Sequence, residues 1–98
     1  MFYNLEKLKV CTVGMPTKNS TPNIAIQTAG ICENHAVFEC EGDVASVRIG
    51  DQKVIEASGV CVNGVKLTNT DKCLLNHNDR IVVGEKNVFL FKHARKMD

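Results

Sequence analysis

The stretch of residues 58–91 constrains the fold most, because it contains two strand–turn–strand units with distinctive turn residues. In the first unit, the apolar alternation of residues 60–62 runs into Asn63 and Gly64, and residues 65–67 resume the pattern. An Asn-Gly pair tolerates positive φ at two successive positions, as a two-residue hairpin turn requires. The sequence therefore predicts a tight β-hairpin centred on Asn63 and Gly64.

A second hairpin is predicted in residues 75–91. A polar turn at residues 76–79 is followed by the strand-like run 80–83, which stops at Gly84 and restarts at residues 88–91. Asparagine, aspartate and glycine in such turns break strands and reverse the chain. We therefore expect the strands on either side of Gly84 to pair with each other.

The rest of the chain has the pattern of further short strands. The long polar loop of residues 15–23 contains two prolines and is predicted to lie on the surface. About nine or ten short strands in all, with no run of helical period, indicate an all-β fold of two packed, largely antiparallel sheets. The strand segments outside the two hairpins are residues 8–13, 24–26, 36–40, 44–49 and 53–56.

Length and composition predict a single domain over residues 1–98. A chain of 98 residues has room for one modest core. Its 44% of apolar and 23% of charged residues are ordinary for a soluble globular protein. No apolar run approaches the roughly 18 residues that a membrane span needs. A net charge of +1 gives no overall attraction to nucleic acid or anionic lipid, so we expect neither as a partner. Because the N-terminus also lacks a basic region ahead of an apolar stretch, we expect an intracellular, cytoplasmic location.

The five cysteines are scattered and odd in number, which argues against a disulfide framework. We expect mainly structural, reduced thiols. The spacings Cys32-x-x-His35 and Cys73-x-x-x-His77 also occur in zinc sites, and a Cys–His pair is one requirement of a cysteine nucleophile. No accompanying acid or oxyanion device is visible, and a sandwich of this size needs no metal. The prediction is therefore no catalytic residue, no metal, no cofactor and no enzymatic activity.

The order of the turn motifs, VNG, then L-x-x-x-D-R-I-x-x-G, then V-F-x-F, resembles the C-terminal half of a forkhead-associated (FHA) domain. The details VNGVKL, DRIVVG and the ending NVFLFKHARK are most similar to the FHA domains of kinesin-3 motors. The resemblance covers about residues 8–93, is strongest from Val60 onward, and leaves residues 94–98 as a tail. It implies an FHA-type β-sandwich of about ten to eleven short strands.

The resemblance also implies which residues would face a ligand. FHA domains that read phosphothreonine carry a Gly-Arg pair at the end of an early strand, and Met15 replaces that arginine here. Their phosphate-binding serine is replaced by Cys32, and Glu33 adds a negative charge beside it. Ser58 stands where those domains place an asparagine that contacts the ligand. Because arginine is a doubly donating cation and a thiol is a weak donor, most of the phosphate contacts are lost.

Several scaffold positions of the family are retained. Gly14, Gly59 and Gly64 match glycines of the family, and His35 matches a histidine that braces its loops. Asn63 also matches and is kept as a ligand candidate, although its task in the predicted hairpin is to turn the chain. The resemblance therefore implies an intact scaffold with an altered binding site.

Two functions remain open. The first is a non-catalytic protein-interaction module of a kinesin-like microtubule motor, which contributes to dimerisation, autoinhibition or cargo binding. Such a module would be associated with the cytoskeleton and would form a homodimer through an adjacent coiled coil. The second is a phosphothreonine-peptide reader, in which Lys18 and its neighbours in the loop 15–21 supply displaced phosphate contacts. The expected partner is a protein in the first case and a phosphopeptide in the second.

Overall fold

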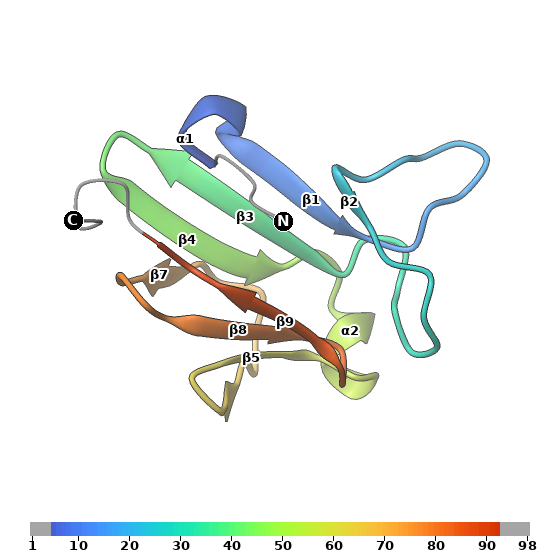
Figure 1. The fold of residues 1–98 in the computed structure, drawn as a ribbon. Helices are drawn as coiled ribbons and strands as arrows, with labels where there is room; N and C mark the ends of the chain where they lie inside the picture. Colours follow the sequence, from blue (N-terminus) through green and yellow to red (C-terminus); the bar gives the residue numbers. More distant parts are fainter. Residues whose placement is uncertain (1–4, 93–98) are drawn as a thin grey trace.

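Two β-sheets pack face to face in a computed structural model of the chain, which describes residues 5–92 (Figure 1). The first sheet has five strands in the order β2-β1-β3-β4-β7, and the second has four in the order β6-β5-β8-β9. The structure confirms the predicted all-β sandwich of two largely antiparallel sheets.

The first sheet supplies the strands that lead into and out of the longest loops. The pair β1 and β2 is parallel, and the other three pairs are antiparallel. A long loop connects β1 to β2, because parallel neighbours cannot be joined by a tight turn. The strands are β1 (Val10–Gly14), β2 (Ile24–Ala25), β3 (Ala36–Glu41), β4 (Val44–Ile49) and β7 (Cys73–Leu75).

The second sheet contains both predicted hairpins and is antiparallel throughout. Asn63 and Gly64 join β5 to β6 with φ values of 52° and 83°, as the Asn-Gly turn predicts. Gly84, with φ of 73°, begins the turn between β8 and β9. The strands are β5 (Val60–Val62), β6 (Val65–Lys66), β8 (Arg80–Val83) and β9 (Asn87–Leu90).

Asn63 also links the two hairpins to each other. Its backbone N–H donates to the Arg80 carbonyl at 2.7 Å, and its Oδ1 accepts the Arg80 N–H at 2.9 Å. Its Nδ2 donates to Asp79 Oδ1 at 2.9 Å. These bonds fix the C-terminal end of β5, so Asn63 has a structural task in this fold.

The hydrophobic core lies between the two sheets. Side chains alternate along each strand, so that Ile81 and Val83 of β8 are buried while Arg80 faces solvent. An edge-to-face contact between Phe38 of β3 and Phe89 of β9, with ring centroids 5.9 Å apart, joins the sheets. Full burial of each large aliphatic side chain contributes about 1.5–3 kcal/mol, which makes this core the main source of stability.

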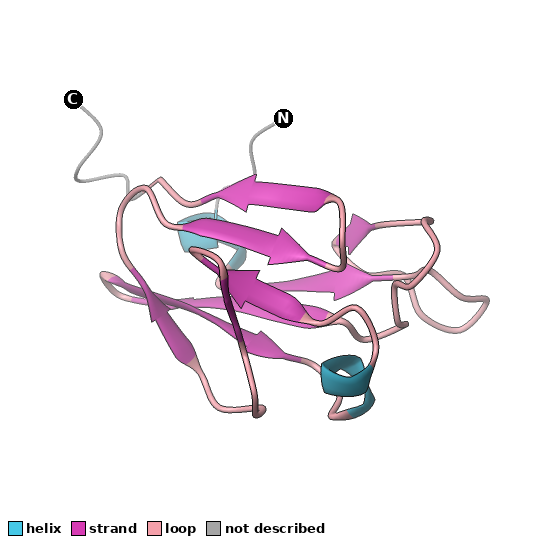
Figure 2. Cartoon of the chain, turned by 90° about the horizontal axis from the view of Figure 1, so that it is seen from below, coloured by secondary structure: helices cyan, strands magenta, loops and turns pink. Residues whose placement is uncertain are grey.

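Two segments are helical rather than extended, and both are single turns at opposite ends of the fold (Figure 2): α1 (Leu5–Leu8) and α2 (Lys53–Glu56). The prediction of a strand at residues 53–56 is therefore wrong. Asp51 Oδ1 accepts the N–H of Lys53 at 3.1 Å, which favours the helical turn. The turn lets Val54 enter the core while its neighbour Lys53 stays exposed.

The first strand also starts later than predicted, at Val10 and not at residue 8. α1 runs to Leu8, and Lys9 then turns the chain with φ of 64°. Residues 5–92 thus contain nine strands, and the predicted tail at residues 94–98 lies outside the described residues. No helix in residues 5–92 is long and apolar enough to cross a membrane.

Candidate functional site

Three segments converge at one end of the sandwich, to the right in Figure 1. They are the loop 15–23 after β1, the segment 26–35 before β3, and the segment 50–59 between β4 and β5. The Met15 N–H donates to the Cys32 carbonyl at 3.0 Å, which holds the first two segments side by side. We call this region the loop end of the domain.

His35 ties the middle segment of the loop end to the segment 50–59. Its ring is fully buried, and its Nδ1 accepts the N–H of Cys32 at 3.1 Å. Its Nε2 lies 2.8 Å from the carbonyl oxygen of Gly59. Since a carbonyl can only accept, Nε2 carries the ring proton and donates it. Burial lowers the pKa of His35, with a smaller opposing effect from the bond to Gly59, so the imidazole is held neutral.

Gly14 and Gly59 lie where chain segments come very close together. A Cβ on Gly14 would be 2.1 Å from the carbonyl oxygen of Glu33, so β1 runs directly against the turn before β3. Gly59 has φ of 74°, and its carbonyl accepts from the Gly84 N–H at 2.9 Å as well as from His35. The close approach to backbone atoms excludes a side chain at Gly14, and the positive φ disfavours one at Gly59.

Apolar packing holds the two side chains that replace phosphate-binding residues in the family comparison. Met15 and Cys32 are half-buried and pack against the hydrophobic core. A thioether has no proton to donate, and a thiol is a weak donor. These two positions therefore contribute to the core and offer no strong hydrogen bond to an anion.

Ser58 lies at the loop end, but its hydroxyl is engaged within the fold. Its Oγ donates to the Gly30 carbonyl at 2.6 Å, which ties the segment 50–59 to the segment 26–35. Asn63 and Gly64 are not brought to this region. They lie at the far end of β5, where a Cβ on Gly64 would meet nothing within 4 Å. The structure thus separates Asn63 from the other candidate ligand residues.

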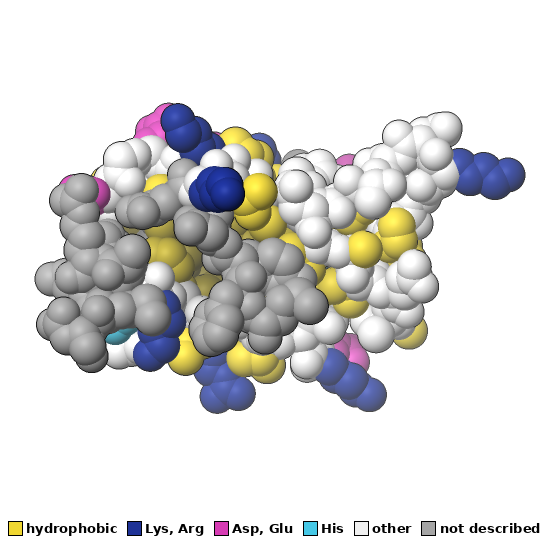
Figure 3. Space-filling model, turned by 45° about the horizontal axis from the view of Figure 1, so that its top comes forward, with side chains coloured by type: hydrophobic (Ala, Val, Ile, Leu, Met, Phe, Trp, Pro, Cys, Tyr) yellow, Lys and Arg dark blue, Asp and Glu magenta, His cyan; other side chains and the backbone are white. Residues whose placement is uncertain are grey.

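Lys18 and Glu33 bring opposite charges to the loop end. Thr17 Oγ1 donates to Glu33 Oε1 at 3.4 Å, and the Thr17 N–H donates to the Ser20 carbonyl at 2.8 Å. These bonds fold the loop over the turn that carries Glu33. Lys18, the basic residue of this loop, is exposed. In the space-filling view, a basic side chain projects from this end beyond mostly uncharged groups (Figure 3).

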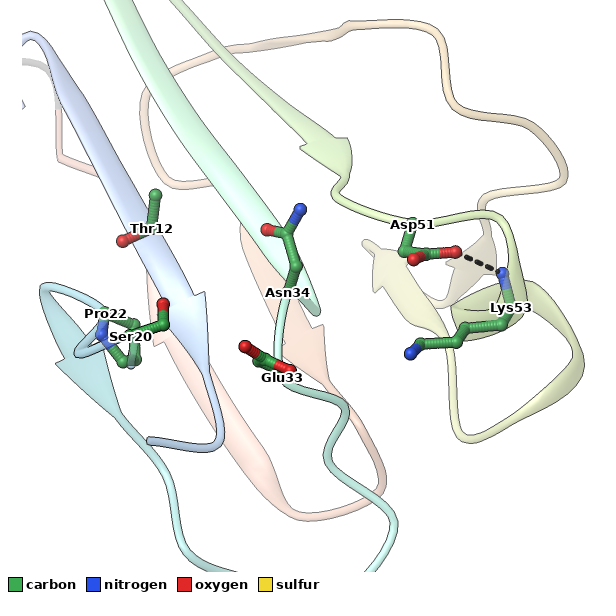
Figure 4. Close-up of a pocket in the computed structure, with 7 residues that line it drawn as sticks. All are labelled: Thr12, Ser20, Pro22, Glu33, Asn34, Asp51 and Lys53. Atoms are coloured by element: carbon green, nitrogen blue, oxygen red, sulfur yellow. Dashed lines mark hydrogen bonds between the residues drawn. The ribbon is translucent and has the colours of Figure 1, made fainter. Parts of the chain in front are cut away.

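A surface pocket of about 400 Å³ opens between these segments (Figure 4). Its walls come from β1, from the loop 15–23, from the turn before β3 and from the start of α2, and Glu33 lies in the middle of them. The lining residues are Thr12, Ser20, Pro22, Glu33, Asn34, Asp51 and Lys53.

The charges of the pocket are mixed, with two carboxylates and one ammonium group. Asp51 accepts the backbone N–H of Lys53, and Asn34 Nδ2 donates to the Gly50 carbonyl at 3.1 Å. These bonds fix the walls on the side of α2. A pocket of this kind suits polar backbone groups and a basic side chain better than a phosphate dianion, which the carboxylates would repel.

Sequence reasoning identified Glu33 but missed Thr12, Asp51 and Lys53. Thr12 is an ordinary polar residue of a strand, and nothing in the sequence around it indicates a binding site. Because residues 53–56 were wrongly predicted to form a strand, the position of Lys53 beside the pocket was not predicted. Asp51 could have been predicted as a candidate, because a Gly-Asp pair after an apolar run indicates a turn at the end of a strand.

The geometry does not favour metal or thiol chemistry at the Cys–His pairs. Both ring nitrogens of His35 are engaged with backbone groups, so neither is available to a metal beside Cys32. Within residues 5–92, no group of three or more His, Cys, Asp or Glu side chains is placed to share a metal ion. None of the five cysteines forms a disulfide, and burial raises the pKa of Cys11, which makes its thiol less reactive.

A sandwich that presents a pocket between loops at one end has the architecture of a binding module. The sequence matches the family model of the FHA domain over residues 11–84. The chain therefore belongs to the FHA family, whose members are non-catalytic modules of protein interaction that bind phosphothreonine peptides.

Solved FHA structures share this fold. Mycobacterium tuberculosis EmbR, in complex with a low-affinity phosphopeptide, is 20% identical with a TM-score of 0.68, over 87% of this chain and 20% of that one. The yeast Dun1 FHA domain, in complex with a doubly phosphorylated Rad53 peptide, is 24% identical with a TM-score of 0.64, over 92% of this chain and 63% of that one. The N-terminal FHA domain of Saccharomyces cerevisiae Rad53p, with a phosphothreonine peptide, is 17% identical with a TM-score of 0.62, over 93% of this chain and 82% of that one.

At these identities the similarity shows the fold. The chain spans 20% of the EmbR chain and 63% of the Dun1 chain. Comparison with curated proteins gives no significant match.

Proposed function

We propose that this FHA domain is a non-catalytic interaction module that binds a protein partner at its loop end without requiring phosphothreonine. The packing of Met15 and Cys32 against the core carries the proposal. The resemblance to phosphate-reading FHA domains implies an arginine and a serine at these two positions. A hydrogen bond to a charged group contributes about 1.5–3 kcal/mol, so the loss of both removes a large part of the roughly 8 kcal/mol of a micromolar interaction.

The charges near these positions support the same function. Glu33 follows Cys32 directly and lies in the pocket, where its carboxylate would repel a phosphate group. Ser58, the other candidate donor on this side, already donates to the Gly30 carbonyl. The loop end therefore favours an unmodified peptide over its phosphorylated form.

Exposed Lys18 supports a second candidate function, which is phosphothreonine reading through displaced contacts. No hydrogen bond or ion pair within residues 5–92 holds its side chain, so its ammonium group is free to reach a ligand from the loop 15–21. Phosphopeptide complexes of EmbR, Dun1 and Rad53p show that related sandwiches bind such ligands. Lysine is a single, mobile point charge and would grip phosphate less firmly than arginine.

Titration with a library of phosphothreonine peptides and their unphosphorylated counterparts separates the two functions. We expect no preference for the phosphorylated form. Phosphate-dependent binding near micromolar affinity, abolished by Lys18→Gln, would instead establish the second function. Lys9→Gln is the matched control, because Lys9 is an exposed lysine at the opposite end of β1.

We further propose that the domain belongs to a kinesin-like microtubule motor, in which it contributes to dimerisation, autoinhibition or cargo binding. The motifs VNGVKL, DRIVVG and NVFLFKHARK support this proposal. It places the protein in the cytoplasm on the cytoskeleton, as a homodimer through an adjacent coiled coil. Co-sedimentation of the full-length protein with microtubules tests it, and retention in the supernatant with or without ATP analogues would contradict it.

A further inference from the structure

Two opposite charges that form no ion pair within residues 5–92 line the pocket at the loop end. Glu33 and Lys53 are both exposed, and neither is part of a salt bridge in the described chain. The carboxylate of Glu39, by contrast, pairs with Arg48 at 2.8 Å and with Lys72 at 3.3 Å. The pocket therefore presents one acidic and one basic side chain whose charges are left for a ligand.

The two charged groups lie on different walls of the pocket. Glu33 occupies its middle, on the turn before β3, and Lys53 extends into it from the start of α2 (Figure 4). Glu33 Oε1 accepts a long hydrogen bond of 3.4 Å from Thr17 Oγ1, which leaves the other carboxylate oxygen to a ligand. Only the backbone N–H of Lys53 is bonded, to Asp51 Oδ1, so the donors of its ammonium group are also available.

Hydrogen bonds close the wall on the side of the loop 15–23. The N–H and the hydroxyl of Thr12 donate to Asn23 Oδ1 at 2.9 and 3.2 Å. The Asn23 N–H donates back to Thr12 Oγ1 at 3.1 Å. These three bonds hold the end of the loop against β1, and Ser20 and Pro22 of the same loop complete this wall.

The wall on the side of α2 is equally well defined. Asn34 Nδ2 donates to the Gly50 carbonyl, and the Gly50 N–H donates to the His35 carbonyl, both at 3.1 Å. A Cβ on Gly50 would lie 2.4 Å from Asn34 Oδ1 and 2.5 Å from its carbonyl oxygen, so the two segments are in direct contact. Because the walls are formed before a ligand arrives, binding needs little ordering of the protein.

A ligand that carries both charges matches this pocket better than a ligand with one. A phosphate dianion meets the carboxylates of Glu33 and Asp51, and a lone cation meets the ammonium group of Lys53. A cation beside Glu33 together with an anion beside Lys53 gives two attractive contacts. The pocket is therefore complementary to a ligand in which a cation and an anion lie a short distance apart.

An extended peptide presents such a pair of charges on alternate residues. Side chains two positions apart in an extended chain point to the same side, with about 7 Å between them. A pocket of about 400 Å³ has the size of a ligand site and takes the side chains of two residues. Arginine is the favoured cation, because its planar guanidinium can bond both oxygens of a carboxylate such as that of Glu33.

We propose that the pocket binds an arginine and an acidic residue two positions apart in an unphosphorylated segment of the partner protein. The arginine pairs with Glu33, and the acidic side chain pairs with Lys53. The order of the two residues depends on the direction in which the segment crosses the loop end. This inference rests on the function proposed above, in which the loop end binds a protein without requiring phosphothreonine, and it names the residues that the partner supplies.

The test uses the fluorescently labelled peptide Gly-Ser-Arg-Thr-Glu-Ser-Gly, capped at both ends, and the peptide with its arginine and glutamate exchanged. Variants of each carry glutamine in place of one or both charged residues. Titration with the chain at low salt should give saturable binding for at least one of the two charged peptides. Replacement of both charges should weaken that binding at least about fivefold, and high salt should reduce the difference.

Double-mutant cycles assign each charge to its partner. In Glu33→Gln, replacement of the peptide's arginine should no longer weaken binding, whereas replacement of its glutamate still should. In Lys53→Gln the two effects should be reversed. Glu41→Gln and Lys9→Gln are the matched controls, because both residues are exposed at the opposite end of the sandwich, and both variants should bind like the natural chain.

The pocket assignment and the proposed function fail on different results. Equal binding of the charged and the glutamine peptides, no saturable binding, or cycles without coupling at Glu33 and Lys53 would overturn the pocket assignment and leave the proposed function standing. The same peptides with phosphothreonine in the middle test the function itself. If they bind at least about tenfold more tightly and Lys18→Gln abolishes this gain, the proposed function is wrong, and the inference that rests on it is wrong too.

Discussion

The imidazole of His35 donates its Nε2 proton to the carbonyl oxygen of Gly59 across 2.8 Å. Its other nitrogen accepts the N–H of Cys32, so one buried ring joins the backbones of two segments that form the loop end. Each partner is fixed in its role as donor or acceptor, which permits one neutral tautomer. The shape of the candidate binding site therefore depends on an uncharged histidine.

Replacement of this ring should destabilise the domain strongly. His35→Ala removes two hydrogen bonds, leaves the Cys32 N–H without a buried partner and creates a cavity. We expect the free energy of unfolding to fall by about 3 kcal/mol, measured by urea denaturation. Glu85→Ala, at an exposed turn residue, should change it by less than about 0.5 kcal/mol. Equal effects of the two substitutions would show that the ring is not a structural bridge.

Stability should also fall as the solution is acidified through the range of histidine. Burial lowers the pKa of His35 in the folded state below its ordinary value of 6.5. Between the folded and the unfolded pKa, the unfolded chain binds more protons, so the stability is complete above 6.5 and is lost as the pH falls below it. Unfolding curves at a series of pH values should show this loss for the natural chain and a smaller one for His35→Gln. Identical profiles would contradict the prediction.

A second loss of stability is expected in the range of the carboxylic acids. The hydrogen bond from Arg48, with a further contribution from Lys72, lowers the pKa of Glu39. Bonds from the Asn76 N–H and the Asn63 side chain lower the pKa of Asp79. For groups with a depressed pKa, the stability is present above the ordinary pKa and is lost as the pH falls through the folded one. Asp79→Asn should therefore reduce the loss of stability at acidic pH, measured by the same unfolding experiments.

The turns explain why so much of the fold was predictable. Asn63 and Gly64 specify a hairpin by their own backbone preferences, whatever surrounds them, and Gly84 does the same for the next one. Residues 53–56 carry no such local signal. Val54 and Ile55 fit a short strand as well as a helical turn, and the choice is made by the need to bury Val54 and by the bond from Lys53 to Asp51.

The binding site was less predictable, because it is assembled from distant segments. Thr12, Glu33 and Asp51 share one pocket only once β1, the turn before β3 and the start of α2 are in place. The resemblance to the FHA family identified Glu33 because this residue follows Cys32 in a motif of the family. It did not predict that Asn63 lies at the far end of β5, away from the pocket. Contacts between loops depend on tertiary packing, which alternation and turn residues do not encode.

Gly14 provides a sharp test of the packing between β1 and the turn before β3. In Gly14→Ala the new Cβ would lie 2.1 Å from the Glu33 carbonyl oxygen, and a backbone atom cannot move aside cheaply. We expect a loss of about 2–4 kcal/mol in the free energy of unfolding. Gly42→Ala is the matched control, since no atom lies within 4 Å and its φ of 60° accounts for a cost of about 1 kcal/mol. Similar losses in both variants would refute the close approach.

Restoration of the missing donors should convert the loop end into a phosphothreonine site. In Met15→Arg with Cys32→Ser, the planar guanidinium and the hydroxyl replace two side chains that pack against the core. We expect affinity for a phosphothreonine peptide to rise at least about tenfold, corresponding to about 1.4 kcal/mol, with no change for the unphosphorylated peptide. Met15→Gln with Cys32→Ala, which lacks the cation and the hydroxyl, should show no gain. If the first double variant keeps the stability of the natural chain and still does not discriminate phosphate, then the loss of these two residues is not what separates this domain from phosphate readers.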